Sequence, residues 1–106
     1  MFARCVTVRI KAGMSAEASH ILESEVLPLL RGRRGFQDAI FLAAPDGTET
    51  VGISLWDSQE SADAYQNETF AAVERITAKV TEGTPQVKTY EVSHTTLRRT
   101  AARGNA

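Results

Sequence analysis

The tripeptide Pro45-Asp46-Gly47 constrains the fold more than any other feature of this chain. Proline, aspartate and glycine are turn-forming residues, and these three separate two segments rich in apolar residues, 36–44 and 48–56. In residues 36–44 both faces of the expected strand are apolar, with Ile40 and Leu42 on one face and Ala39, Phe41 and Ala43 on the other. Two such segments joined by so short a turn predict an antiparallel β-hairpin.

The chain before the hairpin predicts one strand and one helix. Residues 3–11 alternate as a strand, and Ser15 is placed to be the N-cap of the helix that follows. The apolar stripe of this helix consists of Ala18, Leu22, Val26 and Leu29. Pro28 removes a backbone donor, so we expect a kink or a separate short turn before Arg31.

The sequence after the hairpin predicts a helical segment followed by a strand. Asp57 and Glu60 have the spacing of a capping box, and Asn67 is a candidate interruption of the helix that starts there. An amphipathic helix continues through Phe70, Val73, Ile76 and Val80, and we expect Gly83 and Pro85 to end it. The last strand, 86–95, is weakly specified on both faces, which is typical of an edge strand or an exchanged strand.

This element order is that of an α+β ferredoxin-like sandwich, an antiparallel sheet with helices on one face. We expect a single domain over residues 1–96 and a basic, flexible tail over 97–106. Two helices cover only one face of such a sheet, yet its central strands carry apolar residues on both. The uncovered face would expose more apolar surface than a monomer normally tolerates, so we expect a homodimer that packs two sheets face to face, with the last strand reaching across to the partner.

Composition excludes several functional classes. Three of the 12 basic residues and none of the 13 acidic residues lie in the tail, so the domain is mildly acidic and we expect no nucleic-acid partner. No apolar run is long enough to span a membrane, and the chain enters a strand pattern at once without a leader segment, so we expect no membrane partner and a cytoplasmic location. Cys5 is the only cysteine, for which we expect a buried, inert thiol.

The strand that ends at Trp56 carries the clearest functional signal. Its alternation places Gly52, Ser54 and Trp56 on one face. Two small residues beside the only tryptophan leave space over the sheet, which either a helix fills or a ligand occupies. Trp56 is therefore either plain core or the wall of a pocket.

Several segments together resemble the antibiotic biosynthesis monooxygenase (ABM) family of dimeric α+β barrel proteins. The resemblance rests on Leu27-Pro28-Leu29-Leu30, Gly35-Phe36, Leu55-Trp56-Asp57-Ser58, Phe70 and Thr84-Pro85, and it covers the chain to about Thr96. It implies a homodimeric barrel with a pocket between the sheet and the helices of each subunit. In that pocket it implies cofactor-independent oxygenation of an aromatic or quinol-like substrate or, in a divergent branch, binding and breakdown of haem.

The haem branch fits this sequence poorly. Its members carry an Asn on the first strand, a Trp at the end of the third and an axial His on the second helix, and only Trp56 matches. Val73 or Glu74 stands where the axial ligand would lie, so haem would lose its main anchor. The chain also lacks a glycine-rich phosphate loop and a Cys/His cluster, so we expect no cofactor: no flavin, nucleotide, metal or haem.

Two functions remain open. One is a monooxygenase acting on a hydrophobic aromatic or polyketide-like compound. The other is a non-catalytic homodimer that binds a small apolar ligand or serves as an auxiliary subunit. The pocket candidates are shared by both: Trp56 as the wall, Gly52, Ser54 and Thr7 on strands, Tyr65 as a donor from a helix, and Phe70 on the lid side. No strong general base stands out, since we expect His20 to be solvent-exposed and His94 to be structural or interfacial. Arg4 and Arg9 lie on opposite faces of the first strand, so at most one of them could reach a pocket, and we expect surface or interface roles for them.

Overall fold

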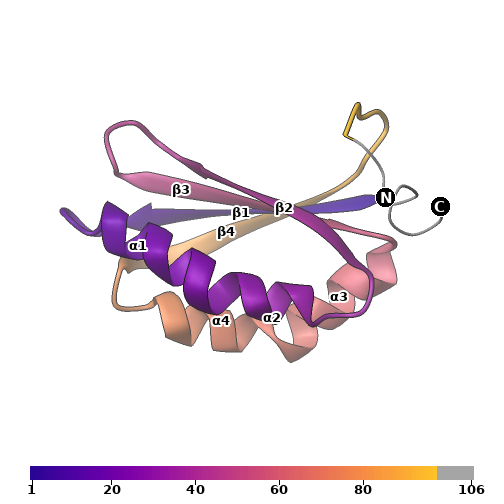
Figure 1. The fold of residues 1–106 in the computed structure, drawn as a ribbon, viewed down its shortest axis with the longest axis horizontal. Helices are drawn as coiled ribbons and strands as arrows, with labels where there is room; N and C mark the ends of the chain where they lie inside the picture. Colours follow the sequence, from indigo (N-terminus) through magenta and orange to yellow (C-terminus); the bar gives the residue numbers. More distant parts are fainter. Residues whose placement is uncertain (98–106) are drawn as a thin grey trace.

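A four-stranded antiparallel sheet forms one layer of the molecule, and the helices form the other (Figure 1). The structure is a computed structural model that describes residues 1–97, so most of the predicted basic tail lies outside the described residues. The strands are β1 (Phe2–Ile10), β2 (Phe36–Ala43), β3 (Glu49–Trp56) and β4 (Thr81–Glu91), in the spatial order β2-β3-β1-β4. The predicted ferredoxin-like α+β sandwich is confirmed.

The predicted hairpin pairs β2 with β3 in antiparallel register. In its turn, Asp46 accepts hydrogen bonds from the Thr48 backbone N–H at 3.0 Å and the Thr48 hydroxyl at 2.7 Å. Those bonds favour the ionised carboxylate and hold the pKa of Asp46 below its usual value. Gly47 takes a positive φ of 78°, which a side chain would oppose. The turn sequence thus supplies both the bend and its internal hydrogen bonds.

The first helical segment is continuous but changes its winding. It consists of α1 (Ser15–Ile21), a π-helical turn η1 (Leu22–Val26) and α2 (Leu27–Arg31). The Leu27 N–H bonds to the carbonyl of Leu22, five residues back, just before Pro28. This wide turn rotates the following residues, so the buried residue of α2 is Leu30 and not the predicted Leu29. Met14 occupies the N-cap position without a side-chain bond, so the Ser15 cap is also wrong.

The second helical segment begins and breaks one or two residues away from the predicted positions. Ser58, and not Asp57, caps α3 (Gln59–Glu68), accepting a bond from the Ser61 N–H at 3.2 Å. The break before α4 (Phe70–Thr77) falls at Thr69 instead of Asn67.

Strand β4 starts earlier than the sequence suggested. Gly83 and Pro85 lie within it instead of ending the helix, since an edge strand tolerates a residue without a backbone N–H. The register with β1 shifts between Thr7 and Arg9, opposite this stretch. Over residues 81–91, β4 pairs with β1 of its own chain, so it is an edge strand.

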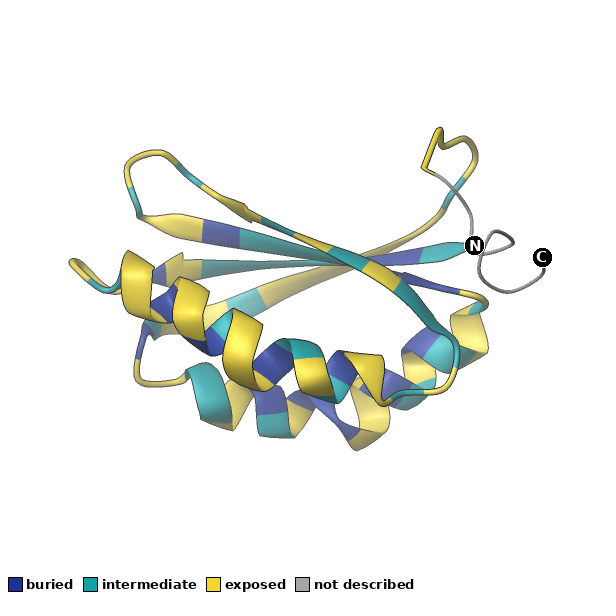
Figure 2. Cartoon of the chain, in the orientation of Figure 1, coloured by how far each residue is buried: buried dark blue, intermediate teal, exposed yellow. Residues whose placement is uncertain are grey.

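The core lies between the sheet and the helices, where the inward faces of both layers are buried (Figure 2). The opposite face of the sheet has no helix over it. Ile40 and Leu42 are exposed there, and Cys5 is half-buried instead of fully buried as expected. Within residues 1–97, no helix has the length and apolar character needed to cross a membrane.

Candidate functional site

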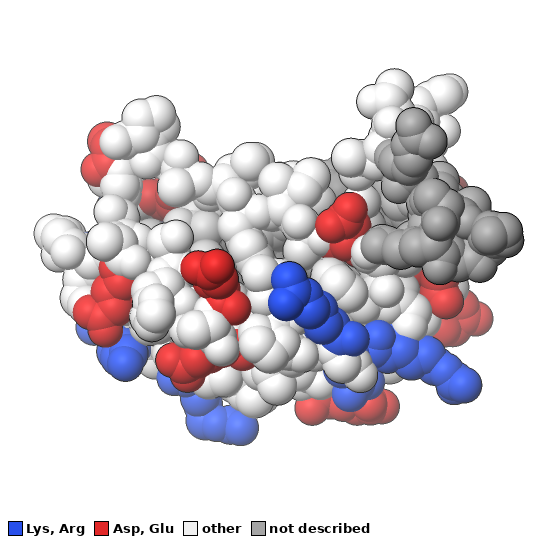
Figure 3. Space-filling view, viewed as in Figure 1, with Lys and Arg blue, Asp and Glu red and all other residues white. Residues whose placement is uncertain are grey.

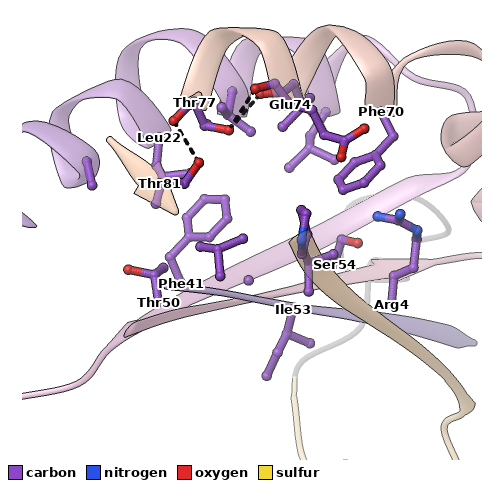
Figure 4. A pocket seen from close by; sticks show the side chains of 18 of the residues that line it. Arg4, Leu22, Phe41, Thr50, Ile53, Ser54, Phe70, Glu74, Thr77 and Thr81 are labelled. Atoms are coloured by element: carbon purple, nitrogen blue, oxygen red, sulfur yellow. Dashed lines mark hydrogen bonds between the residues drawn. The ribbon is translucent and has the colours of Figure 1, made fainter. Parts of the chain in front are cut away.

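A cavity lies between the helix-facing side of the sheet and the helices (Figure 4). Its volume is about 80 Å³ for the centres of water-sized molecules, which is room for several waters or for part of a small organic ligand. Most of its walls are apolar, as is usual for a small-molecule site. The lining residues are Arg4, Val6, Val8, Ile10, Ala18, Leu22, Val26, Leu30, Phe41, Thr50, Gly52, Ile53, Ser54, Tyr65, Phe70, Val73, Glu74, Thr77, Val80, Thr81 and Pro85.

Four of the six residues singled out from the sequence line this cavity, and two do not. Gly52, Ser54, Tyr65 and Phe70 lie around it. Thr7 pairs with Val51 on the opposite face of the sheet, one residue out of phase with the cavity-facing residues of β1. The expectation that the Thr7 hydroxyl reaches the pocket is therefore wrong.

Trp56 lies in the core beside the cavity and is not among the residues that line it. It is completely buried, and its ring packs against Phe36 and Tyr65 with centroid separations of 5.6 and 5.2 Å. Its indole Nε1–H donates to the Ser54 hydroxyl at 2.9 Å, so the one polar atom of the ring is satisfied. Of the two interpretations of Trp56, the structure places it as core.

The space over Gly52 is partly filled by a neighbouring side chain. Phe41 lies directly opposite on β2, and a Cβ added to Gly52 would come within 3.1 Å of the Phe41 ring. The missing side chain of Gly52 therefore makes room for Phe41, which itself lines the cavity. The sequence pattern did identify the right face of the sheet, but not the cross-strand aromatic that lies over the glycine.

Arg4 is the site residue that the sequence did not predict. It lies on the helix-facing side of β1 and is only 2% exposed, whereas we expected a surface or interface role. Its guanidinium carbon lies 4.9 Å from the centroid of the Tyr65 ring and 4.6 Å from that of Phe70. The sequence did contain one signal for this position. Arg4 shares a strand face with three apolar residues, Val6, Val8 and Ile10, and that face was a candidate for burial.

Burial shifts the pKa values of Arg4 and Tyr65, which line the cavity beside Phe70. Desolvation lowers the pKa of Arg4 below its ordinary value, opposed by the fields of Tyr65 and Asp63. Desolvation also raises the pKa of Tyr65 above 10.0, opposed by Arg4 and Arg33. Tyr65 therefore stays protonated at neutral pH, so its hydroxyl can donate a hydrogen bond but cannot act as a base there.

Threonine hydroxyls line the end of the cavity away from Phe70, and the carboxylate of Glu74 lies between these threonines and Phe70 (Figure 4). Thr77 and Thr81 donate to the carbonyls of Val73 and Thr77 at 2.9 and 3.2 Å, so their hydroxyl hydrogens are already used (Figure 4). Glu74 lines the cavity from an exposed position on α4. His20 and His94 are both exposed and outside the cavity lining. Among residues 1–97, no cluster of three His, Cys, Asp or Glu side chains could hold a metal ion.

Comparison with solved structures identifies the fold. A protein from Nitrosomonas europaea that is named as an antibiotic biosynthesis monooxygenase superposes with a TM-score of 0.73 at 14% identity, over 89% of this chain and 100% of that one. A monooxygenase from the gene ActVA-Orf6 of Streptomyces coelicolor, in complex with nanaomycin D, gives 0.74 at 20% identity, over 92% and 91%. SnoaB, a cofactor-independent oxygenase from Streptomyces nogalater, gives 0.74 at 13% identity, over 92% and 97%.

The chain has the antibiotic biosynthesis monooxygenase fold. No protein-family model and no curated protein matches the sequence. The resemblance first noted in the sequence is therefore confirmed at the level of the ABM fold. Because identities of this size establish fold alone, the function of this ABM-fold chain has to be argued from its own cavity.

Proposed function

We propose that this chain is a cofactor-independent monooxygenase that acts on a hydrophobic aromatic or polyketide-like compound in the cavity between its sheet and helices. The observation that carries the proposal is the cavity itself, whose walls are mostly apolar and include the donors Arg4, Ser54 and Tyr65. Support also comes from the solved structures with this fold, one a cofactor-independent oxygenase and another a monooxygenase in complex with the ligand nanaomycin D.

In this reaction the substrate itself reduces dioxygen, so the protein does not need a redox cofactor. An electron-rich phenol that loses a proton can react with dioxygen directly; one oxygen atom enters the ring, and the other leaves as water with two hydrogens from the substrate. The protein supplies a site shielded from water and donors that stabilise the anion. Ser54 and Tyr65 are placed to be such donors, and Phe70 to close the apolar side.

Oxygen uptake tests the catalytic proposal. With a dihydroxynaphthalene as substrate, we expect the purified chain to accelerate conversion to the hydroxynaphthoquinone, with one dioxygen consumed per quinone formed and no added cofactor. A Tyr65→Phe variant should be slower because the anion loses a donor, by roughly tenfold for one such bond. The rate in buffer is the baseline. Conversion no faster with protein than without it, across a panel of phenols and quinols, would reject the oxygenase.

One observation favours the second candidate, a non-catalytic binding or auxiliary protein. A catalytic base should lie within reach of the substrate proton, with a pKa near the working pH. The carboxylate that lines the cavity, Glu74, is exposed, and neither histidine lies in the lining. Binding of the phenols to the purified chain, measured by calorimetry, with no oxygen uptake in the assay above would assign the chain to this class.

We also propose that the chain acts as a homodimer in the cytoplasm. The helix-free face of the sheet supports the dimer, because its apolar residues include the exposed Ile40 and Leu42 and the half-buried Ile53, whose side chain points away from the cavity in Figure 4. In Figure 3 most of the charged side chains in view lie over the helices and loops. A second copy packed on this face would cover it.

Light scattering tests the dimer. We expect twice the mass of one chain at micromolar concentration, and we expect Ile53→Asp to unfold the protein, because this face would serve as core in the dimer. The control is Ser24→Asp, which places the same charge on an exposed residue of η1 and should leave the mass unchanged. A well-folded monomer of the parent chain would contradict the proposal.

A further inference from the structure

The charge on Arg4 is not neutralised by a contacting carboxylate. Among the described residues, the ion pairs are Arg33 with Glu68 and Lys79 with Glu17, and Arg4 belongs to neither. Asp63 acts on Arg4 only as a more distant field from an exposed position on α3. A buried cation without an ion pair is unfavourable unless other contacts compensate it, which raises the question of what the guanidinium binds.

The contacts that Arg4 does make leave most of its donors free. The flat guanidinium lies against the rings of Tyr65 and Phe70, and these aromatic faces partly compensate the charge. One Nη2–H donates to Gln66 on α3. A guanidinium has five N–H donors, and within residues 1–97 this is the hydrogen bond that Arg4 makes. The other donors are available to a molecule in the cavity.

The residue directly across the sheet from Arg4 adds a donor, and the exposed carboxylate of Glu74 lies on the other side of the cavity, on α4 (Figure 4). Ser54 lies directly opposite Arg4 in the β1–β3 pairing, on the same face of the sheet. Its oxygen already accepts from Trp56, so its own hydroxyl hydrogen can be donated into the cavity. Figure 4 shows Arg4 and Ser54 at the Phe70 end of the cavity, with Phe41 and Thr50 toward the other end. A planar cation beside a hydroxyl is the arrangement that binds an anionic oxygen group.

We propose that the cavity takes an aromatic ligand that carries a negatively charged oxygen group, a carboxylate or an ionised phenol. That group binds to Arg4 and Ser54, and the ring body extends among the apolar residues toward Phe41. Arg4 would then select the ligand and fix which end of it lies at Ser54. The inference rests on the proposed function in that the ligand occupies the same cavity.

A matched pair of probes separates charge recognition from apolar binding. Naphthoate and its neutral amide, naphthamide, have the same ring body and differ in the charge of the end group. By calorimetry at neutral pH and fixed salt, we expect the parent chain to bind naphthoate roughly 10 to 100 times more tightly, the range for a hydrogen-bonded charged pair. Arg4→Met, which keeps the length of the side chain and removes the charge, should lose this preference while still binding naphthamide.

Arg9→Met is the control variant. Arg9 lies on the same strand but is exposed and outside the cavity lining, so this change removes the same charge and should leave the preference intact. The role of Arg4 would be overturned if Arg4→Met still preferred naphthoate, or if the parent bound both probes equally. Either result would still be compatible with a ligand cavity. If neither probe bound to the parent, the ligand cavity and hence the proposed function would fail.

A second measurement needs no variant. In the parent chain, the NMR signal of the Arg4 Nε–H should shift on titration with naphthoate and stay in place with naphthamide, because only the anion bonds to the guanidinium. An Arg4 signal that responds equally to both probes, or to neither while both bind, would overturn the inference even if Arg4→Met did not fold.

Discussion

Trp56→Ala should lower the free energy of unfolding by roughly 3 to 5 kcal/mol, the range for removing a large aromatic side chain from a core. Trp56 is completely buried, and its loss would remove the contacts with Phe36 and Tyr65. It would also leave the Ser54 hydroxyl without its donor. Urea denaturation followed by circular dichroism measures the change, since the variant has no tryptophan fluorescence.

Tyr90→Ala provides the comparison for this loss. Tyr90 is an aromatic residue of the sheet that is 52% exposed, so its truncation should change stability far less. If Trp56→Ala and Tyr90→Ala had equal unfolding midpoints, the burial of Trp56 in the core would not contribute to stability as the structure indicates.

Gly35→Ala is the second substitution with a large expected effect. Gly35 has a φ of 84°, and an added Cβ would lie 2.2 Å from the Ser61 hydroxyl oxygen and 2.5 Å from an oxygen of Asp57. The left-handed conformation costs roughly 1 to 2 kcal/mol for alanine, and the overlap costs roughly 1 to 3 kcal/mol more. Thermal or urea unfolding should therefore show a loss of roughly 2 to 5 kcal/mol.

Gly13→Ala separates the two contributions to that loss. Gly13 has nearly the same conformation, with a φ of 77°, but an added Cβ would meet nothing within 4 Å. This variant should lose only the conformational part, roughly 1 to 2 kcal/mol. If both variants lost the same free energy of unfolding, the overlap of the added Cβ at Gly35 with Ser61 and Asp57 would make no contribution.

The fold was predictable because its signals are local. The turn at Pro45-Asp46-Gly47 and the alternation on either side of it depend on neighbours in the sequence, and the hairpin follows from them. Helix starts were less predictable, because Asp57 and Ser58 are both good caps and only the geometry of the loop decides between them. The winding of the first helical segment was not predictable, since a π-turn has no residue signature comparable with that of a turn.

The site was predictable only in part, because its remaining features depend on cross-strand register. Gly52 and Ser54 line the cavity from the sheet, and Tyr65 and Phe70 line it from the helices, which are the elements that the sequence predicted for them. The sequence analysis did not show that Phe41 lies opposite Gly52, since that depends on the register that the turn sets between β2 and β3. The position of Arg4 was missed for a different reason: arginines are rarely buried without a carboxylate, so the ordinary expectation was the surface.

The π-turn at Leu22–Val26 gives this chain a simple means of reshaping its binding site. Leu22 and Val26, the two ends of the turn, both line the cavity, and the turn holds more residues than an α-helical turn would. Deleting one of the three exposed residues between them would let the segment wind as an α-helix, without touching the sheet. A single codon therefore separates two shapes of the cavity wall, which insertion or deletion could change instead of substitution.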